Sequence, residues 1–494
     1  MRRLRTAIAG LPAAARACFL LALVNAVVWG AIVPPFQVPD ETSHFAYAQY
    51  LAETGKPPPQ GPGAAYSPQE SYALQDLLFS QTIGDPNMRG VLTTAQNRVL
   101  QRDLSRGLSP LSEGGASPAT NQPPLYYALA AVPYWISPSH QILTRLAIMR
   151  LLSALLAAGT VLAVFLFLRE LLPGSPWAWT VGALMVAFQP MVDFIAAGVQ
   201  GDNLLYLASA VTFLALARAY RRGLTRARAA GIGAACAVGL LTKLTFLALT
   251  PGIALAVLIL GRRELATGRR RAVGLVALAA VVALVPFGVY GLLNLTAWHR
   301  GSFLAGGTVG ATASTLPGGG VVTLHETLDY IWEQYLPRLP FMHRRFFAGT
   351  PLINIWLNGL VGRFGWLDYS FPGWVYTLAK VLLIPFLALA LSGLLRARGA
   401  IRRLLPLLLS FGVMTLGLLV AIGYAGVRYQ LSTGYPFAQA RYLFPLLALY
   451  GLLGALVARG AGRRWAPVLG AGLVLLAMAH GLFAETLTIS RYYG

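Results

Sequence analysis

Acidic residues are scarce in this sequence. Its 494 residues include 17 Asp and Glu against 39 Lys and Arg, and only 11% of all residues are charged, while 56% are hydrophobic. So little charge excludes an ordinary soluble protein and indicates a polytopic membrane protein. The formal net charge of +22 would suit a polyanion-binding protein, so the positions of the basic residues must decide between the two explanations.

Motifs of several common protein classes are missing as well. The sequence has no phosphate-cradling glycine-rich loop and no serine elbow, so nucleotide hydrolysis finds no support. No repeat of 20–50 residues is visible, and a solenoid is therefore not expected. The two cysteines, Cys18 and Cys236, both fall in apolar segments, where they are more typical of packing residues than of a disulfide.

Long apolar segments predict an all-α, polytopic membrane protein, organised as a single membrane-embedded domain over residues 1–494 with about 11 transmembrane helices. The expected spans lie near 12–33, 142–169, 177–197, 203–220, 229–243, 245–261, 272–291, 374–396, 404–424, 441–457 and 465–485. Two long outer segments, 34–141 and 292–373, separate some of these spans, and loops of this length are usually functional. Within them we expect interfacial helices near 40–53, 68–80, 87–105, 122–137 and 350–364.

The basic residues are sorted by side. With these spans, 22 of the 39 basic residues fall on one side of the membrane, together with only two acids, Glu170 and Glu264. This is the positive-inside pattern, and we expect a bacterial inner-membrane protein with a cytoplasmic N-terminus and an external C-terminus. The basic excess is therefore a topology signal, and a nucleic-acid partner is excluded.

The segment Pro39-Asp40-Glu41-Thr42-Ser43-His44 follows directly after the first span. A helix that begins at Pro39 would place Asp40 and His44 four residues apart on one face, with Glu41 and His44 three apart. This acid pair at the outer membrane surface is the first candidate for catalysis. The alternative is a helix cap followed by a solvated loop. Glu41 and His44 could also bind a divalent metal ion with ligands from elsewhere, and metal dependence stays open.

Two further polar elements lie on the same predicted side. Asn121, Gln122 and Tyr126 belong to an Asn-Gln-Pro-Pro-Leu-Tyr-Tyr motif that closes the first outer segment and opens an interfacial helix. That motif either binds substrate or simply starts a helix with an aromatic anchor. Asp202 stands at the outer start of the fourth span, where it either caps the helix or faces Asp40 across a cleft.

Lys243 and Arg441 are the candidate phosphate-binding cations. Lys243 interrupts an apolar stretch at the outer turn between the fifth and sixth spans, where a lysine in lipid would be costly unless it reaches the interface. Arg441, followed by Tyr442, stands at the outer start of the tenth span and could grip a phosphate with two parallel hydrogen bonds.

Taken in order, these short motifs resemble the GT-C membrane glycosyltransferases, and most closely a bacterial branch known mainly as predicted membrane proteins. The resemblance rests on Pro39-Asp40-Glu41 with His44, the Pro-Pro-Leu-Tyr-Tyr element, the Thr-Lys element at Lys243, Gly201-Asp202-Asn203, Arg363-Phe364-Gly365-Trp366-Leu367-Asp368 and Arg441-Tyr442-Leu443-Phe444-Pro445. One departure is Gln122, because many GT-C proteins have histidine before the two prolines. It weakens the case for a metal or acceptor role at this position.

The resemblance implies an inverting glycosyltransferase that takes a sugar from a polyprenyl-phosphate donor on the outer face of the membrane. Asp40 would then be the general base, with Asp202 as the second acid, and Glu41 and His44 would orient the base or the acceptor. Lys243 and Arg441 would hold the donor phosphate, and Asn121, Gln122, Tyr126 and Tyr442 would complete the substrate site. The acceptor would be a glycan, a lipid or a protein, and membrane lipids are further partners.

Two other classes compete with this interpretation. A transporter or lipid flippase would carry ionisable groups near the bilayer midplane and show an internal repeat, whereas the charges here gather at one surface. A non-catalytic scaffold of envelope assembly would not need an acid pair facing basic phosphate ligands. The sequence does not identify the sugar, the acceptor, the anomeric product or the oligomeric state.

Overall fold

The computed structural model describes residues 10–59, 65–115, 119–304, 323–342, 350–433 and 437–494. Within these residues, nine helical segments are long and apolar enough to cross a membrane. They are α2 (Ala13–Ile32), α8 (Ile142–Leu171), α11 (Asp202–Arg222), α13 (Thr250–Glu264) with the short helices η2 (Leu244–Leu249) and η3 (Leu265–Thr267), α14 (Arg269–Thr296), α17 (Gly373–Arg396), α18 (Arg398–Thr433), α19 (Leu447–Gly460) with η5 (Ala440–Leu446), and α20 (Gly462–Tyr493).

The two remaining predicted spans are a bent helix pair and a short helix. The span expected at 177–197 is broken into α9 (Pro176–Ala187) and α10 (Pro190–Ala196), which meet at 60°. Pro190 cannot continue the backbone hydrogen bonds of α9, so α10 starts there in a new direction. The span expected at 229–243 is α12 (Arg226–Thr242), a 17-residue helix packed against α11 and α14. The all-α membrane fold is thus confirmed.

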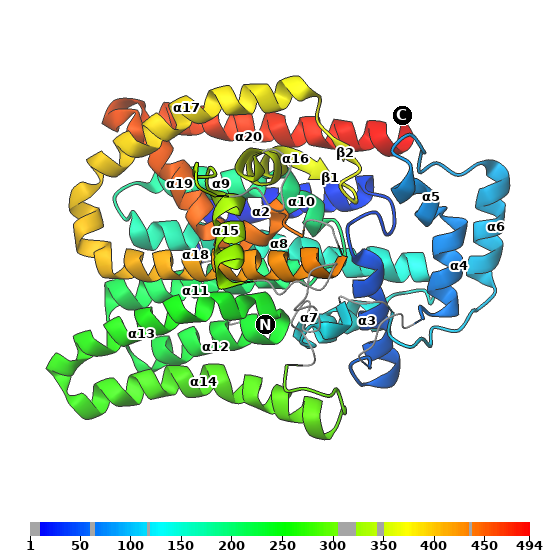
Figure 1. Ribbon diagram of the computed structural model, residues 1–494, viewed down its shortest axis with the longest axis horizontal. Helices are drawn as coiled ribbons and strands as arrows, with labels where there is room; N and C mark the ends of the chain where they lie inside the picture. The colour runs from blue at the N-terminus through cyan, green and yellow to red at the C-terminus, as the bar shows by residue number, and fades with distance from the viewer. Residues whose placement is uncertain (1–9, 60–64, 116–118, 305–322, 343–349, 434–436) are drawn as a thin grey trace.

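The helices of the first long loop gather at one end of the helix bundle, here called the outer end, while α15 and α16 lie against the bundle nearer its middle (Figure 1). The loop elements have the following bounds. They are α3 (Glu41–Thr54), α4 (Pro68–Asp76), α5 (Phe79–Gly84), α6 (Thr94–Ser105), η1 (Ala119–Asn121), α7 (Leu125–Ile136), α15 (Leu324–Tyr335), η4 (Leu352–Leu357), α16 (Asn358–Gly362) and a two-stranded antiparallel hairpin of β1 (Arg363–Phe364) and β2 (Tyr369–Ser370). The expected interfacial helices are present, whereas α15 and the hairpin are not predicted by the sequence pattern.

Ion pairs distinguish the two ends of the bundle. At the end opposite the loops, here called the basic end, Glu170 of α8 accepts from Arg222 at 2.6 Å and from Arg218 at 3.2 Å, both on α11. At the outer end, Arg491 near the end of α20 pairs with Asp368 of the hairpin at 2.9 Å. The C-terminal end of α20 therefore lies beside the loops. Which end faces the cytoplasm stays a prediction of the positive-inside rule.

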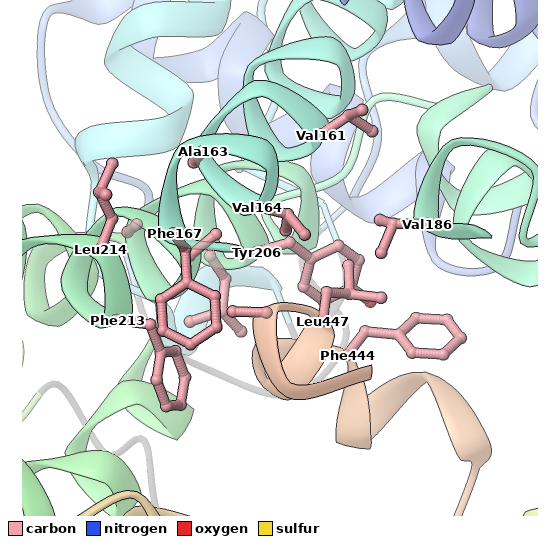
Figure 2. Close-up of a cluster of buried hydrophobic side chains, with 14 of the residues drawn as sticks. Val161, Ala163, Val164, Phe167, Val186, Tyr206, Phe213, Leu214, Phe444 and Leu447 are labelled. Carbon is pink, nitrogen blue, oxygen red and sulfur yellow. The ribbon is translucent and has the colours of Figure 1, made fainter. Parts of the chain in front are cut away.

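A buried apolar cluster joins several helices of the bundle (Figure 2). Its labelled members come from α8, α9, α11, η5 and α19: Val161, Ala163, Val164, Phe167, Val186, Tyr206, Phe213, Leu214, Phe444 and Leu447. The Tyr206 ring meets the Phe444 ring edge-on at 5.7 Å, and the Tyr206 hydroxyl donates to the carbonyl of Arg441 at 3.3 Å. The cluster thus fixes the backbone that carries Arg441.

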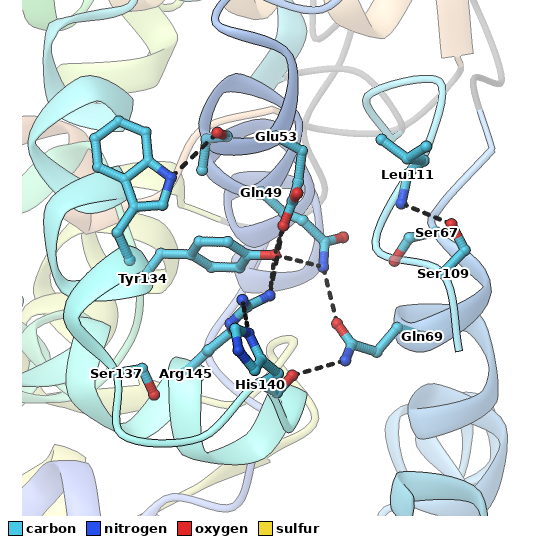
Figure 3. A network of polar contacts seen from close by, with 12 residues as sticks. Gln49, Glu53, Ser67, Gln69, Ser109, Leu111, Tyr134, Ser137, His140 and Arg145 are labelled. Carbon is cyan, nitrogen blue, oxygen red and sulfur yellow. Dashed lines mark hydrogen bonds and ion pairs between the residues drawn. The ribbon is translucent and has the colours of Figure 1, made fainter. Parts of the chain in front are cut away.

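A polar network fixes α3 against α4, α7 and α8 (Figure 3). Tyr134 of α7 donates to Glu53 at 2.6 Å, and the guanidinium of Arg145 lies 3.8 Å from the centre of the Tyr134 ring. Gln49 of α3 donates to Gln69 of α4 at 3.2 Å. Because the helix is held along its length, the residues at its start have a defined position.

Candidate functional site

Asp40 lies immediately before α3 with a strained backbone. The helix begins at Glu41 and not at Pro39, so Asp40 lies just before the helix instead of within its first turn. Asp40 has φ 63° and ψ 4°, a left-handed conformation that is rare for residues other than glycine, and its side chain makes no capping hydrogen bond. Such strain persists where the surroundings impose it, often at functional sites.

The Asp40 carboxylate faces Arg441. The Oδ2 atom of Asp40 accepts from Nη2 of Arg441 at 2.7 Å, and the Asp40 side chain is 24% exposed whereas that of Arg441 is 7% exposed. Burial alone would raise the pKa of the Asp40 carboxyl, but the charges of Arg441 and Lys243 lower it below its usual range. Asp40 is therefore an ionised carboxylate at neutral pH.

Asp202 and Lys243 form a second ion pair beside the first. Nζ of Lys243 donates to Oδ1 of Asp202 at 2.6 Å, so the lysine neither reaches into lipid nor stands alone. Asp202 is the first residue of α11. Its Oδ1 atom accepts from Lys243, and its Oδ2 atom is buried without a hydrogen-bond partner among the described residues. The Asp202 carboxylate therefore pairs with Lys243 and does not cap its own helix.

The two ion pairs form one cluster. The charges of Arg441 and Lys243 act on both Asp40 and Asp202, although the four residues are distributed from position 40 to 441. Among the described residues, the Nε and Nη1 atoms of Arg441 are buried and have no hydrogen-bond partner. Two acids and two cations leave the cluster without net charge, but it retains spare donors on Arg441 and a spare acceptor on Asp202. Such a site can take an anion and a hydroxyl group together.

His44 is held as a neutral ring beside the cluster. Its Nδ1 atom lies 2.8 Å from the Tyr127 hydroxyl, and the two rings stack at 5.8 Å. Burial, and then the charge of Lys243, lower the pKa of His44 to about 4. The Tyr127 ring also stacks on Tyr47 of α3 at 3.6 Å. His44 can therefore position the start of α3 but does not carry a charge at neutral pH.

Glu41 points away from Asp40 into a structural ion pair. Arg150 of α8 binds it with two bonds, Nε to Oε1 at 2.8 Å and Nη2 to Oε2 at 2.6 Å. Arg150 also donates to the carbonyl of Val33 at 2.8 Å, at the end of α2, and the backbone N–H of Val199 donates to Glu41 at 2.9 Å. The structure thus places Glu41 at the junction of α2, α3 and α8, outside the Asp40 cluster.

The remaining predicted binding residues lie around the cluster. The Gln122 side chain accepts from the backbone N–H of Leu244, next to Lys243, at 3.4 Å. Tyr126 lies 3.4 Å from Ser153 through its hydroxyl, and Asn121 ends η1. The guanidinium of Arg441 lies 5.5 Å from the centre of the neighbouring Tyr442 ring.

A small cavity and a larger apolar groove meet at Ala440, the residue before Arg441. A cavity of about 50 Å³ is lined by Pro39, Arg363 and Arg441, among others. An apolar groove of about 510 Å³ is lined by side chains of η4, α17, α18 and α19, including Trp356. Ala440 lines both, so the apolar groove reaches the residue next to Arg441.

No group of three or more His, Cys, Asp and Glu side chains is arranged to hold a metal ion within the described residues. The metal pair considered from the sequence is also divided. Glu41 bonds Arg150, whereas His44 bonds Tyr127. These two residues therefore do not share a site.

Three residues of this region have roles that the motifs do not predict. Arg150 could be noticed as a cation within an apolar span, which is costly unless the charge is paired. Tyr127 belongs to a motif whose function the sequence leaves open. Arg300, which follows α14, is buried and donates to the carbonyl of Thr120, 180 residues away. No local sequence pattern predicts such a long-range contact.

The chain has distant similarity to larger solved structures. The oligosaccharyltransferase of Archaeoglobus fulgidus, in its apo form, matches with a TM-score of 0.46 and 12% identity over 97% of this chain and 56% of that one. The arabinosyltransferase EmbB of Mycobacterium smegmatis matches with a TM-score of 0.35 and 14% identity over 98% of this chain and 42% of that one. This chain thus spans about half the length of either structure.

A comparison with curated proteins gives no match. A family of sequences described as "Predicted membrane protein (DUF2142)" matches residues 23–450, which is most of the chain. The matched residues include Asp40, Asp202, Lys243 and Arg441. The protein is therefore a member of this family of predicted membrane proteins.

Proposed function

We propose that this protein is a GT-C-type membrane glycosyltransferase that moves a sugar from a polyprenyl-phosphate donor to an acceptor on the outer face of a bacterial inner membrane. The observation that carries the proposal is the cluster of Asp40, Arg441, Asp202 and Lys243, which combines a strained, ionised carboxylate with unpaired phosphate donors. The order of the sequence motifs supports the same assignment.

The donor would bind with its phosphate at Arg441 and its tail in the apolar groove. Arg441 has two free guanidinium nitrogens, and guanidinium groups bind phosphate through parallel hydrogen bonds. The groove of about 510 Å³ begins at Ala440, one residue away. Each methylene kept out of water stabilises the bound lipid by about 0.8 kcal/mol, so the tail favours this groove while the phosphate rises to the cluster.

Asp40 would act as the general base of a single displacement. The acceptor oxygen attacks the anomeric carbon, the bond from that carbon to the phosphate oxygen breaks, and polyprenyl phosphate leaves with the bonding electrons. Asp40 takes the proton of the acceptor hydroxyl. One displacement inverts the configuration at the anomeric carbon, and the charge that develops on the phosphate is stabilised by Arg441 and Lys243.

Donor binding would also release the base. In the ligand-free protein, Arg441 holds Asp40 at 2.7 Å and lowers its pKa. A phosphate bound to Arg441 competes for the same guanidinium, which weakens this ion pair and raises the proton affinity of Asp40. The base is thus strongest when the donor is present.

The first prediction tests this base. Asp40→Asn keeps the shape of the side chain but cannot accept the proton, so we expect sugar transfer to fall by about 10²-fold or more while donor binding is retained. Transfer is measured in proteoliposomes with a panel of labelled polyprenyl-phosphate sugars. Asp85→Asn serves as the matched control, because Asp85 is exposed in the first outer loop. Full transfer by Asp40→Asn would remove Asp40 from the chemistry, and lipid movement without transfer would favour a flippase.

A further inference from the structure

Arg300 is a buried cation without a partner acid. Its side chain lies at the outer end, after α14, and the residue is 3% exposed. One nitrogen, Nη2, donates to the carbonyl of Thr120, while Nε and Nη1 make no hydrogen bond of good geometry within the part of the chain that the structure describes. A buried charge left unpaired is strongly unfavourable, so its presence calls for a counter-charge.

No other part of the chain can supply that counter-charge as a carboxylate. All 17 acidic residues of the sequence fall within the described residues, and none of the ion pairs there involves Arg300. The segments outside the described residues contain no Asp or Glu. Within the described residues, Arg300 therefore has no carboxylate partner, and an anion from outside this polypeptide could supply the counter-charge.

The side chains around Arg300 are polar. The hydroxyls of Tyr47 and Tyr290 contact the guanidinium through weak hydrogen bonds, and Tyr290 also contacts Asn294 in this way. Within the described residues, three more buried polar atoms make no hydrogen bond of good geometry: the hydroxyl of Thr120, the hydroxyl of Tyr290 and Oδ1 of Asn294. Buried polar atoms are normally satisfied, so a group of unsatisfied ones around one cation marks a place where a ligand or water binds. Hydroxyl and guanidinium donors together suit an oxyanion.

The polar side chains around Arg300 are separate from the Asp40 cluster but joined to it through Gln122. The Tyr47 hydroxyl donates to the Gln122 carbonyl at 3.3 Å, while the Gln122 side chain accepts from Leu244, next to Lys243, at 3.4 Å. The segment Ala119 to Gln122 therefore contacts Arg300 through the carbonyl of Thr120, and contacts Leu244, the neighbour of Lys243, through the side chain of Gln122.

We propose that Arg300 forms a second oxyanion site at the outer end and binds an acidic group, phosphate or carboxylate, of the sugar acceptor. The assignment to the acceptor rests on the proposed function, in which the donor phosphate occupies Arg441 and Lys243. An acidic group at Arg300 would position the acceptor on the far side of Gln122, with its reacting hydroxyl turned toward Asp40. Specificity for an acidic acceptor follows, because a neutral one leaves the guanidinium unpaired.

The test counts oxyanion sites in the purified full-length protein. Inorganic phosphate is titrated calorimetrically, and in parallel by its effect on thermal unfolding, into the unchanged protein, Arg300→Gln, Arg441→Gln and the double variant. We expect two sites in the unchanged protein, one in each single variant and none in the double variant. Titration with acetate then distinguishes a carboxylate-accepting site from one that takes phosphate alone. Arg98→Gln, which removes an exposed arginine of α6, is the matched control and should keep both sites.

Arg300→Lys distinguishes loss of the site from a folding defect. Lysine keeps the positive charge but cannot form the two parallel hydrogen bonds of arginine, so this variant should bind phosphate at the second site, more weakly than the unchanged protein. Two sites remaining in Arg300→Gln would overturn the proposal, as would a single site already in the unchanged protein. Where a working acceptor is known, Arg300→Gln should raise its KM by about tenfold or more with the donor KM unchanged. Because phosphate counting needs no turnover, a protein without transferase activity would refute the proposed function and leave the Arg300 site to be judged separately.

Discussion

At the residue scale, Asp40 and Glu41 are neighbours in opposite surroundings. Glu41 is fully buried and bonded to Arg150, which also binds the carbonyls at the end of α2. Asp40 is partly exposed, strained and paired with Arg441, which belongs to a different part of the chain. The first carboxylate stabilises the junction of α2, α3 and α8, and the second is available for chemistry. Two adjacent acids therefore have separate roles because one residue adopts a left-handed backbone.

This contrast gives the second prediction. Glu41→Gln leaves the buried guanidinium of Arg150 without its counter-charge, which costs about 3 kcal/mol or more in folded-state stability. Asp40→Asn also removes a partner of a buried guanidinium, but it should lower stability less, because Asp40 is partly exposed and the charge of Asp202 still acts on Arg441. Thermal unfolding of the two purified variants measures the difference. Equal melting temperatures would contradict the structural role of Glu41.

The third prediction concerns His44 and pH. Burial lowers the pKa of His44 to about 4 in the folded protein, against about 6.5 for a free histidine. Between these values the unfolded chain binds a proton that the folded protein excludes, so this contribution to stability is complete above pH 6.5 and is lost as the pH falls toward 4. The loss amounts to roughly 3 kcal/mol. His44→Gln should flatten the dependence of melting temperature on pH over this range, and an unchanged slope would show that another group is responsible.

At the element scale, the site depends on how closely α9 and α19 approach each other. A Cβ atom added to Gly182 of α9 would collide with the backbone of Gly451 on α19 and with Leu168 of α8. The α19 helix follows directly from η5, which carries Arg441. The position of Arg441 therefore depends on a glycine contact in the centre of the bundle.

The fourth prediction follows from this contact. Gly182→Val should lower folded-state stability by about 1–3 kcal/mol, because the two helix backbones must separate to admit the side chain. It should also weaken phosphate binding at Arg441 as η5 shifts. Gly472→Val in α20 is the matched control, since nothing lies within 4 Å of its added Cβ. If both variants melt at the same temperature, the close approach of α9 and α19 has no energetic importance.

The helices themselves could largely be predicted, because hydrophobic length is a local property of the sequence. The break between α9 and α10 is marked by Pro190, but nothing local gives its direction. The conformation of Asp40 could not be predicted, because a proline at position 39 fits both inside the first turn of a helix and just before the helix begins. The sequence order does place Asp40, Asp202, Lys243 and Arg441 on one predicted side. Their pairing joins residues up to 401 positions apart, which periodicity cannot specify.

At the scale of the whole molecule, charge is divided between the two ends of the bundle. The basic end holds Glu170 with its two arginines of α11, whereas the outer end holds the Asp40 cluster, Arg300 and the C-terminal end of α20. A lipid-linked donor and a polar acceptor can meet only where a lipid groove and an aqueous surface lie side by side. In this protein the apolar groove reaches Ala440, the residue next to Arg441 of the cluster.

The fifth prediction is that the outer end faces away from the cytoplasm. The native cysteines, Cys18 and Cys236, are buried, so replacing both with alanine gives a background for single labelled cysteines. Ser105→Cys, exposed at the outer end, should react with a membrane-impermeant maleimide in intact cells. Thr267→Cys, exposed at the basic end between α13 and α14, should react only after the membrane is permeabilised. The positive-inside rule requires this result, because arginines flank Thr267 in the sequence and resist translocation. The reverse pattern would place Asp40 and Arg441 in the cytoplasm and would contradict an extracytoplasmic transfer reaction.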